Sequence, residues 1–355
     1  MELFENLQRT ELSELGEFGL IELLTKNIEL KNQSTLKGVG DDAAVIDVSP
    51  DKLLVSTDVL IEGVHFDLAY TPLKHLGYKS VAVNLSDIAA MNGKPEQITV
   101  NIAVSNRFSV EALEELYQGI YLACNRYGVD LVGGDTTTSN SGLFISITVL
   151  GKAPQEKITY RNGAREGDLI CVSGDLGGAY IGLMVLEREK RVFEVNSEIQ
   201  PDLEGYEYVL ERQLKPEPRL DIVAKFEETG VLPHAMIDIS DGLASEIIHI
   251  CKQSEVGCRL FEEKIPVDLQ TEDIAKKLGL VPVTMALSGG EDYELLFTVP
   301  QSDFETINAM ENISIIGYIT DKAEGMNLIT KDDKLFELKA QGWDAMLNRE
   351  KKIAE

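Results

Sequence analysis

Five acidic clusters constrain the fold of this chain, because each places a carboxylate beside glycine, serine or threonine, mostly where an apolar run ends. Hard divalent cations such as Mg²⁺ prefer oxygen ligands of this kind, usually one or two carboxylates with water and substrate phosphates. Aspartates spread from Gly40 to Gly242 therefore predict a fold that gathers distant segments at one site holding several Mg²⁺ ions, in an enzyme acting on phosphates. The clusters are Gly40-Asp41-Asp42-Ala43, Ser56-Thr57-Asp58, Asn84-Leu85-Ser86-Asp87, Gly133-Gly134-Asp135-Thr136-Thr137 and Asp238-Ile239-Ser240-Asp241-Gly242.

The length of 355 residues exceeds one ordinary hydrophobic core, so two domains are expected. Turn residues at Ala153-Pro154 and Arg161-Asn162-Gly163 indicate a break between them. We predict an N-terminal domain over 1–151 and a C-terminal domain over 152–355. Strands and helices are mixed in both, which predicts an α/β (α+β) fold class.

The net charge of −27 argues against nucleic acid and anionic membranes as partners, since both require clustered basic residues. A phosphate enzyme can still be this acidic, because bound cations reverse the local sign of charge. The N-terminal segment lacks the features of a signal peptide, no run of 18 apolar residues occurs, and no CxxC pair is present. A cytoplasmic location is expected. Three cysteines (Cys124, Cys171 and Cys251) read as core residues, whereas Cys258 cannot be placed.

Apolar periodicity predicts the positions of the main elements. The expected helices cover 17–25, 73–91, 110–127, 176–189, 219–228 and 243–252. The expected strands cover 53–55, 98–104, 144–150, 168–173, 236–239, 293–299 and 315–319. Ser56-Thr57-Asp58 is expected in a loop after its strand, and the charged segment 189–210 is expected to be an irregular surface excursion.

Common phosphate-binding motifs are missing, namely the GxxxxGK[ST] loop, the GxGxxG fingerprint and the eukaryotic-type kinase signature. Phosphate must be held by another route. Asp238 to Gly242 is expected to end a strand and begin a helix, whose N-terminus favours anions. The glycines at 133–134 and 173–178 would let the backbone approach a ligand closely.

Each motif also has a structural interpretation. The acidic clusters could be turns, helix caps or internal polar networks. His65 alone could be structural, as we expect for His75, His234 and His249. Arg161 could reach a phosphate or be solvated, and Trp343, the only tryptophan, could stack on a ring substrate or cover a core edge.

The motifs in their order resemble the thiamine-monophosphate kinase family, within the aminoimidazole ribonucleotide synthetase superfamily. The resemblance runs over nearly the whole chain. It rests on Glu14–Ile21, Gly40–Asp42, Ser56–Phe66, Val83–Ile88, Val132–Thr136, Arg161–Arg165, Met236–Leu243 and Ser288-Gly-Gly-Glu-Asp-Tyr-Glu-Leu-Leu296.

The resemblance implies ATP- and Mg²⁺-dependent phosphorylation of thiamine monophosphate to thiamine diphosphate, the last step in making that cofactor. It also implies a homodimer joined by a β-barrel of N-terminal domains, with the active site between the domains of each chain. The implied metal ligands are Asp42, Ser56, Thr57, Asp58, Asp87, Asp135, Asp238 and Asp241, with Asp41 in reserve. The implied ATP contacts are Tyr117, Gly134, Asp135, Arg161 and Ser240. The implied contacts to the thiamine end are His65, Glu291 and Trp343.

Phosphoryl transfer needs positioning and charge neutralisation more than an enzymic nucleophile. The acceptor phosphate is largely ionised at pH 7, so we predict direct in-line transfer without a phosphoenzyme and assign no catalytic base. Sister enzymes of the superfamily are the nearest alternatives. Selenophosphate synthetase is expected to carry a reactive cysteine near its N-terminus, and the hydrogenase-maturation dehydratase is expected to end in cysteine. The purine-pathway synthetase is expected to lack the Ser-Gly-Gly-Glu-Asp-Tyr-Glu pattern that stands at 288–294 in this chain. A non-catalytic nucleotide-binding protein is the alternative from another class.

Overall fold

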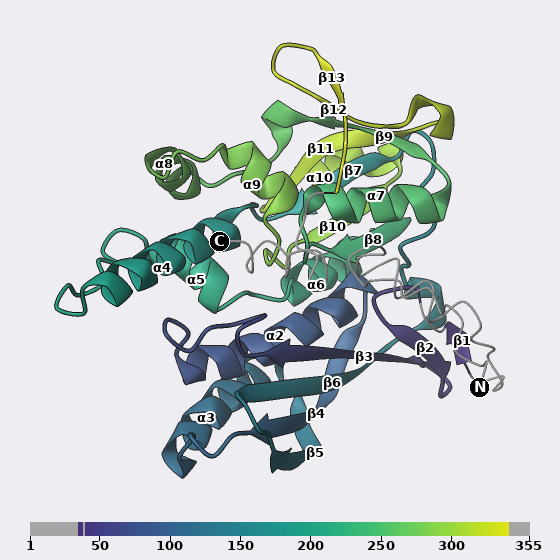
Figure 1. Cartoon of the computed structure of the whole chain (residues 1–355). Coiled ribbons are helices and arrows are strands. Elements are labelled where there is room, and N and C mark those ends of the chain that lie inside the picture. Colours follow the sequence, from purple (N-terminus) through teal and green to yellow (C-terminus); the bar gives the residue numbers. More distant parts are fainter. Residues whose placement is uncertain (1–34, 38–39, 341–355) are drawn as a thin grey trace, which may run out of the picture.

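The computed structural model describes residues 35–37 and 40–340, which form two sheets flanked by helices (Figure 1). The strands are β1 Thr35–Lys37, β2 Ala44–Asp47, β3 Lys52–Ile61, β4 Lys94–Val104, β5 Asp130–Thr138, β6 Leu143–Ala153, β7 Leu169–Ser173, β8 Ala235–Asp238, β9 Gly257–Phe261, β10 Leu295–Val299, β11 Ile313–Thr320, β12 Met326–Ile329 and β13 Leu335–Glu337. The α-helices are α2 Leu73–Ala90, α3 Val110–Tyr127, α4 Gly178–Val195, α5 Glu207–Leu214, α6 Leu220–Thr229, α7 Leu243–Ser254, α8 Leu269–Lys277, α9 Pro282–Ser288 and α10 Phe304–Asn308. Single 3₁₀ turns occur at Gln155–Lys157, Glu262–Lys264, Gln301–Asp303 and Lys322–Glu324.

The N-terminal sheet has six strands in the order β1-β2-β3-β6-β4-β5. Side chains alternate along its central strand β6, where Leu143, Ile145, Ile147 and Val149 are fully buried and the residues between them are not. Helix α2 packs on this apolar face and contacts β3, β4 and β6. The sheet therefore has one helix-covered face and one open face.

Helices α2 and α3 cross closely because glycine stands at both points of contact. A Cβ on Gly77 would lie 2.0 Å from the backbone oxygen of Leu116, and one on Gly119 would lie 1.9 Å from that of Lys74. Any larger residue would push the two helices apart. The crossing fixes the position of α2, which carries Asp87 near its C-terminal end.

The C-terminal sheet has seven strands in the order β13-β12-β9-β11-β7-β10-β8. Alternate residues of β7 enter different cores. Ile170 and Val172 pack in the core that contains α7, while Cys171 packs with Phe226 of α6 and Ile307 of α10. Helices therefore cover both faces of this sheet, and its apolar strands are buried on both sides.

An arm of helices extends from the C-terminal half. It consists of α4, α5 and α8, seen to the left in Figure 1, and encloses a small core around Ile181, Val185 and Val209. The segment between α4 and α5 is almost wholly exposed. The prediction that 189–210 is irregular was wrong at both ends of the segment, because α4 continues to Val195 and α5 begins at Glu207.

The two-domain α/β fold class is confirmed, and most expected elements are present. The prediction that Ser56-Thr57-Asp58 follows a strand was wrong, since β3 continues to Ile61 and pairs with β6 along its full length. Likewise Gly133-Gly134-Asp135 lies inside β5 and forms no turn. Both described sheets are open within one chain, and the expected barrel remains a prediction. The helix expected over 17–25 and Trp343 lie outside the described residues.

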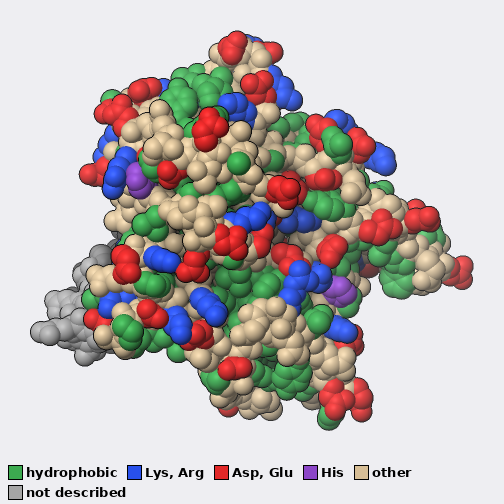
Figure 2. All heavy atoms as spheres, turned by 180° about the vertical axis from the view of Figure 1, so that it is seen from behind, with side chains coloured by type: hydrophobic (Ala, Val, Ile, Leu, Met, Phe, Trp, Pro, Cys, Tyr) green, Lys and Arg blue, Asp and Glu red, His purple; other side chains and the backbone are tan. Residues whose placement is uncertain are grey.

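Surface charge is scattered, and on the face shown in Figure 2 acidic side chains alternate with basic and apolar ones. None of the described helices is long and apolar enough to cross a membrane. All four cysteines are free and buried, including Cys258 on β9. His234 is structural as expected, with Nδ1 lying 2.9 Å from a carboxylate oxygen of Asp168.

Candidate active site

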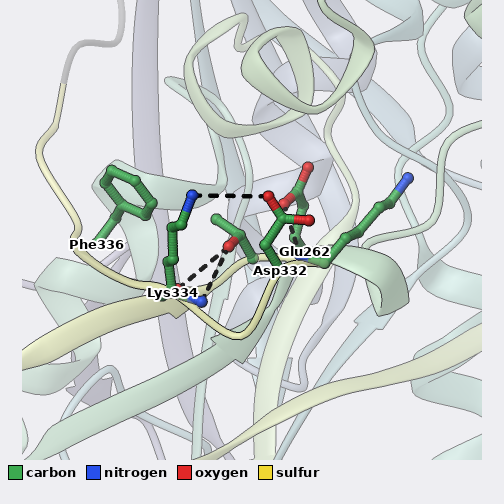
Figure 3. A pocket seen from close by; sticks show the side chains of 6 residues that line it. Glu262, Asp332, Lys334 and Phe336 are labelled. Carbon is green, nitrogen blue, oxygen red and sulfur yellow. Dashed lines mark hydrogen bonds and ion pairs between the residues drawn. The ribbon is translucent and has the colours of Figure 1, made fainter.

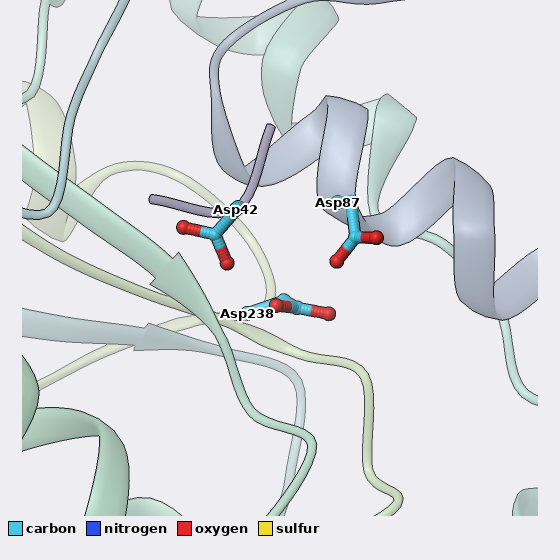
Figure 4. A group of neighbouring side chains, drawn as sticks. All are labelled: Asp42, Asp87 and Asp238. Carbon is cyan, nitrogen blue, oxygen red and sulfur yellow. The ribbon is translucent and has the colours of Figure 1, made fainter. Parts of the chain in front are cut away.

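Three aspartates from distant parts of the chain meet between the two halves of the molecule. Asp42 precedes β2, Asp87 lies on α2, and Asp238 ends β8. One carboxylate oxygen from each lies within 4.8 Å of the others. Figure 4 shows the three side chains pointing toward a common space. We call Asp42, Asp87 and Asp238 the aspartate cluster.

Each member of the cluster is held by one neighbour. Arg161 forms two hydrogen bonds to Asp42, from Nε and from Nη2, both of 2.7 Å. Ser56 Oγ donates to Asp87 over 2.5 Å. Ser86 Oγ donates to Asp238 over 2.7 Å, and this bond joins the N-terminal half to the C-terminal half. The three carboxylates are therefore fixed before any ligand arrives.

The cluster carries more negative charge than its neighbours balance. Burial raises the pKa of Asp87 well above its ordinary value, and the negative charges of Asp58 and Asp238 raise it further. Burial also raises the pKa of Asp238, with Asp42 adding to the rise. Like charges gathered in a desolvated space disfavour the ionised form unless a cation joins them.

The donor set suits Mg²⁺, because it consists of carboxylate oxygens with hydroxyl groups beside them. Asp58 and Asp41 extend the acidic region. Burial raises the pKa of each to about 6, and for Asp41 the charge of Asp42 contributes as well. Asp41 Oδ2 makes no hydrogen bond to any residue of 35–37 and 40–340, and lies 3.5 Å from Lys37 Nζ.

Strand β3 divides Ser56, Thr57 and Asp58 between the two faces of the sheet. Ser56 and Asp58 lie on the helix-covered face, where Ser56 contacts Asp87 and the Asp58 amide donates to Asn84 over 3.1 Å. Thr57 is exposed on the opposite face, because successive side chains of a strand alternate. Its hydroxyl donates to the backbone oxygen of Ile147 and accepts from Thr148. The side chains expected to bind metal at 56–58 are thus not all directed to the aspartate cluster.

A hollow of about 500 Å³ brings together three of the residues expected to contact ATP. They are Tyr117 on α3 and Gly134 and Asp135 on β5. A Cβ on Gly134 would lie 1.9 Å from the backbone oxygen of Val100, so only glycine allows β5 to approach β4 here. The Asp135 carboxylate is exposed and accepts from the Thr136 amide over 2.9 Å. Asp135 is not a member of the aspartate cluster.

Arg161 and Ser240, the other residues expected at ATP, do not line this hollow. Arg161 is engaged by Asp42, and the backbone oxygen of Ser240 accepts from the Glu291 amide over 2.6 Å. Asp241 follows β8 as expected, and its amide donates to Glu246 over 3.1 Å. Ser240 and Asp241 therefore stand at the junction between β8 and α7, next to Asp238.

His65 and Glu291 approach each other although 226 positions separate them in the sequence. Burial lowers the pKa of His65, and the charge of Glu291 opposes this fall. Nδ1 of His65 accepts from the Ile61 amide over 3.0 Å. Glu291 accepts from Lys79 over 3.1 Å and from Gln213 over 2.8 Å. Two residues expected at the thiamine end are thus brought together, while Trp343 lies outside the described residues.

Sequence reasoning missed three residues at this site. Lys79 is a buried lysine of α2, and Tyr293 lies near Asp58 and Asp87. Glu246 is a buried carboxylate whose Oε2 accepts no hydrogen bond from the part of the chain that the structure describes. Tyr293 stands in the 288–296 motif, which could have drawn attention to it. No comparable signal marks Lys79, which stands beside Ser80 in a helix that also carries Lys74 and His75.

A second hollow of about 320 Å³ lies at the β12–β13 hairpin (Figure 3). Its lining residues include Glu262, Lys334 and Phe336. None of the expected site residues within 40–340 lines it. The ion pair from Lys334 to Asp332 measures 3.8 Å between exposed side chains. As far as the structure describes it, the hairpin offers no arrangement of buried charge comparable to the aspartate cluster.

Comparison with known proteins agrees with this geometry. Residues 40–153 match the family described as AIR synthase related protein, N-terminal domain, and residues 165–327 match the corresponding C-terminal domain. The thiamine-monophosphate kinase of Buchnera aphidicola subsp. Schizaphis graminum is 38% identical over 329 residues, which cover 91% of this chain and 96% of the relative. That of Aquifex aeolicus is 36% identical over 333 residues, covering 94% and 98%.

A solved structure described as AaThiL complexed with AMPPCP and TMP is similar to this chain over most of its length. The TM-score is 0.81 at 33% sequence identity, covering 95% of this chain and 99% of that one.

Proposed function

This chain belongs to the thiamine-monophosphate kinase family, and from that premise we propose that it transfers the γ-phosphoryl group of ATP to thiamine monophosphate. The products are thiamine diphosphate and ADP. The observation that carries the proposal is the aspartate cluster, which gathers three carboxylates from both halves of the chain around one space. A related structure that holds an ATP analogue and TMP supports the choice of substrates.

Asp42, Asp87 and Asp238 would hold Mg²⁺, with Ser56, Asp58 and Asp241 close by. Thr57 and Asp135 are proposed as ligands from the sheet. Bound Mg²⁺ would neutralise the phosphate oxygens, whose mutual repulsion otherwise opposes the reaction. Ser56 and Ser86 keep the carboxylates of Asp87 and Asp238 oriented through the hydrogen bonds that they donate.

Tyr117, Gly134 and Asp135 are proposed to contact ATP, and the hollow that they share supports this role. Arg161 and Ser240 are proposed at the phosphate end of the nucleotide. Because Arg161 is paired with Asp42, it would act while keeping that carboxylate in place. The helix N-terminus after Ser240 favours an anion nearby.

His65, Glu291 and Trp343 are proposed to bind the thiamine end of the acceptor. The transfer is proposed to be direct and in line. An oxygen of the acceptor phosphate bonds to the γ-phosphorus while the bond from the γ-phosphorus to the bridging oxygen of ADP breaks. The acceptor oxygen carries no proton that must be removed at pH 7, so no side chain is assigned as a base.

A homodimer is also proposed. Strand β5 lies at one edge of the N-terminal sheet, and all its residues except Leu131 are exposed. An exposed edge strand of nine residues is a surface that a second copy could cover. We further propose a cytoplasmic location, for which the acidic composition and four unpaired cysteines are the support.

The test is to incubate the purified protein with ATP, Mg²⁺ and thiamine monophosphate and to follow thiamine diphosphate by chromatography. We expect product that requires Mg²⁺ and is lost in Asp87→Asn. Asp332→Asn, an exposed aspartate outside the site, is the matched control and should keep full activity. Thiamine and an aminoimidazole ribonucleotide precursor serve as alternative acceptors. A folded protein that binds ATP yet forms no thiamine diphosphate would overturn the proposal.

A further inference from the structure

Successive residues of the turn that carries Glu291 contact different surroundings. Glu291 and Tyr293 lie at the candidate site, whereas Asp292 and Glu294 lie in the interior of the C-terminal half. Glu291 and Tyr293 both have positive φ angles, +59° and +52°. Non-glycine residues adopt this backbone region at a cost of about 1 kcal/mol or more each. Two such residues so close together persist only where surrounding contacts determine the turn.

Asp292 and Glu294 supply those contacts on the interior side. Asp292 accepts from the amides of Gly177 and Ala179, at 2.8 and 3.4 Å, where α4 begins. Glu294 accepts from Ser173 over 2.5 Å and from Arg212 over 3.0 Å, and Arg219 also donates to it. Both side chains are almost completely buried. The backbone of the turn is therefore anchored in the C-terminal half.

The side chain of Glu291 is held separately, by two donors that meet on the same oxygen. Lys79 Nζ and Gln213 Nε2 both donate to Oε2. Within the described part of the chain, every hydrogen bond to the Glu291 side chain falls on this oxygen. Lys79 also donates to the backbone oxygen of Gln213 over 3.0 Å, so the two donors are linked to each other.

Lys79 and Gln213 come from different halves of the molecule. Lys79 is on α2, close to His65, and Gln213 is near the C-terminal end of α5, next to Arg212. Both donors are buried: Lys79 is 4% exposed and Gln213 is 5% exposed. Such burial gives donors little freedom to turn to other partners.

We propose that Gln213 and Lys79 are positioning residues that fix the rotamer of Glu291, leaving its Oε1 directed for the organic part of the acceptor. This inference rests on the proposed function, in which Glu291 contacts the thiamine end. Because neither donor belongs to the aspartate cluster or to the Tyr117 hollow, they should affect recognition of the acceptor and leave the use of ATP unchanged.

Gln213→Leu is the main test, because leucine fills a similar volume but cannot donate to Glu291. We expect the KM for thiamine monophosphate to rise about tenfold or more, as for loss of a hydrogen bond to a charged group. The kcat and the KM for ATP should change less than about twofold. Glu211→Gln, at an exposed position on the same helix, is the matched control and should behave as the wild type.

Two further variants separate positioning from general damage. In a Glu291→Gln background, Gln213→Leu should add little, since its effect passes through the Glu291 carboxylate. Lys79→Met should reproduce the rise in acceptor KM, and Lys79→Arg should largely restore it. If Lys79→Met does not fold, the Gln213 series still decides the matter.

The outcomes distinguish this inference from the proposed function. If the wild-type protein formed no thiamine diphosphate, the proposed function itself would be overturned. An active wild type with an unchanged acceptor KM in Gln213→Leu would overturn the positioning role alone. An equal rise in the KM values for ATP and acceptor, or a full additional effect in the Glu291→Gln background, would also overturn it.

Discussion

Two buried charged clusters stand close together in this protein, and they differ in how their charge is balanced. The aspartate cluster has three carboxylates and one paired arginine, Arg161. The second, which we call the arginine network, consists of Arg212, Arg219, Asp292 and Glu294. There each carboxylate meets a guanidinium or backbone amides.

The comparison teaches that charge balance, more than acidity, separates a candidate cation site from a structural network. Burial raises the pKa of Asp292 to about 7, but Arg212 and the amides of Gly177 and Ala179 oppose the rise. At Asp87 the nearest charged neighbours are carboxylates, which strengthen the rise. Among the described residues, Arg161 pairs with Asp42 alone, so the aspartate cluster holds less compensating positive charge than the arginine network.

The largest effect is expected from neutralising one member of the aspartate cluster. Asp238→Asn should lower kcat/KM about 1000-fold, because metal-assisted charge stabilisation contributes several kcal/mol to such reactions. In the absence of Mg²⁺ its free energy of unfolding should equal or exceed that of the wild type, since a source of repulsion is removed. Activity assays and chemical unfolding would check this. A strongly destabilised Asp238→Asn would mean that this cluster too is structural.

The arginine network should show the opposite response. Arg212→Met should lower the free energy of unfolding by about 3–5 kcal/mol, because it leaves Glu294 buried without a full partner. Urea unfolding would measure the change, with Arg259→Met, whose ion-pair partner Glu324 is exposed, as the control. A loss of less than about 1 kcal/mol would remove the contrast between the clusters.

A smaller effect on stability should come from adding Mg²⁺, which would bring positive charge to the aspartate cluster. At Mg²⁺ concentrations about 100 times the dissociation constant, binding should stabilise the wild type by about 2.7 kcal/mol. Thermal unfolding with Mg²⁺ and with chelator would reveal the difference. Arg212→Met, although weakened, should keep this response, whereas Asp238→Asn should lose most of it. Equal responses in the two variants would contradict a cation site at the aspartate cluster.

The smallest effect is expected at His75, a half-buried residue on α2 outside both clusters, which provides a baseline. Burial lowers the pKa of His75, with the charges of Lys215 and Lys74 adding to the fall. Below an ordinary pKa of about 6.5 the unfolded chain then binds a proton that the native state resists, so stability falls as the pH drops. His75→Gln should flatten this decline by less than about 1 kcal/mol in unfolding curves between pH 7 and pH 5. A steeper decline in the variant would contradict the sign.

Much of the fold could be predicted because its elements have strong periodicity. The helix expected over 110–127 is α3, with the same bounds, and Asp87 and Asp238 were expected on a helix and at a strand end, where they lie. Ser56 to Asp58 could not be placed in a strand from sequence. Three consecutive polar residues conceal the alternation, and hydrogen bonds to Asp87 and Asn84 of α2 make it tolerable for Ser56 and Asp58 to lie on the helix-covered face.

The parts of the site that could not be predicted depend on contacts between residues far apart in the sequence. Arg161 was expected near phosphate or solvent, and its bidentate contact with Asp42 depends on how the two halves meet. Lys79 reads locally as a surface lysine of a helix, and its partners Gln213 and Glu291 lie more than a hundred residues away. Local propensity carries no information about such contacts.

Helix α2 has a consequence for the order in which the protein can fold during synthesis. Ser86 bonds to a residue 152 positions later, and Lys79 to one 212 positions later. At a translation rate of about 5–20 residues per second, the helix must wait on the order of 10–40 s for Glu291 to emerge. Through that interval the nascent N-terminal half exposes the side of α2 that the C-terminal half later covers. A chaperone that shields this helix on the ribosome would therefore have its greatest influence before the second half is complete.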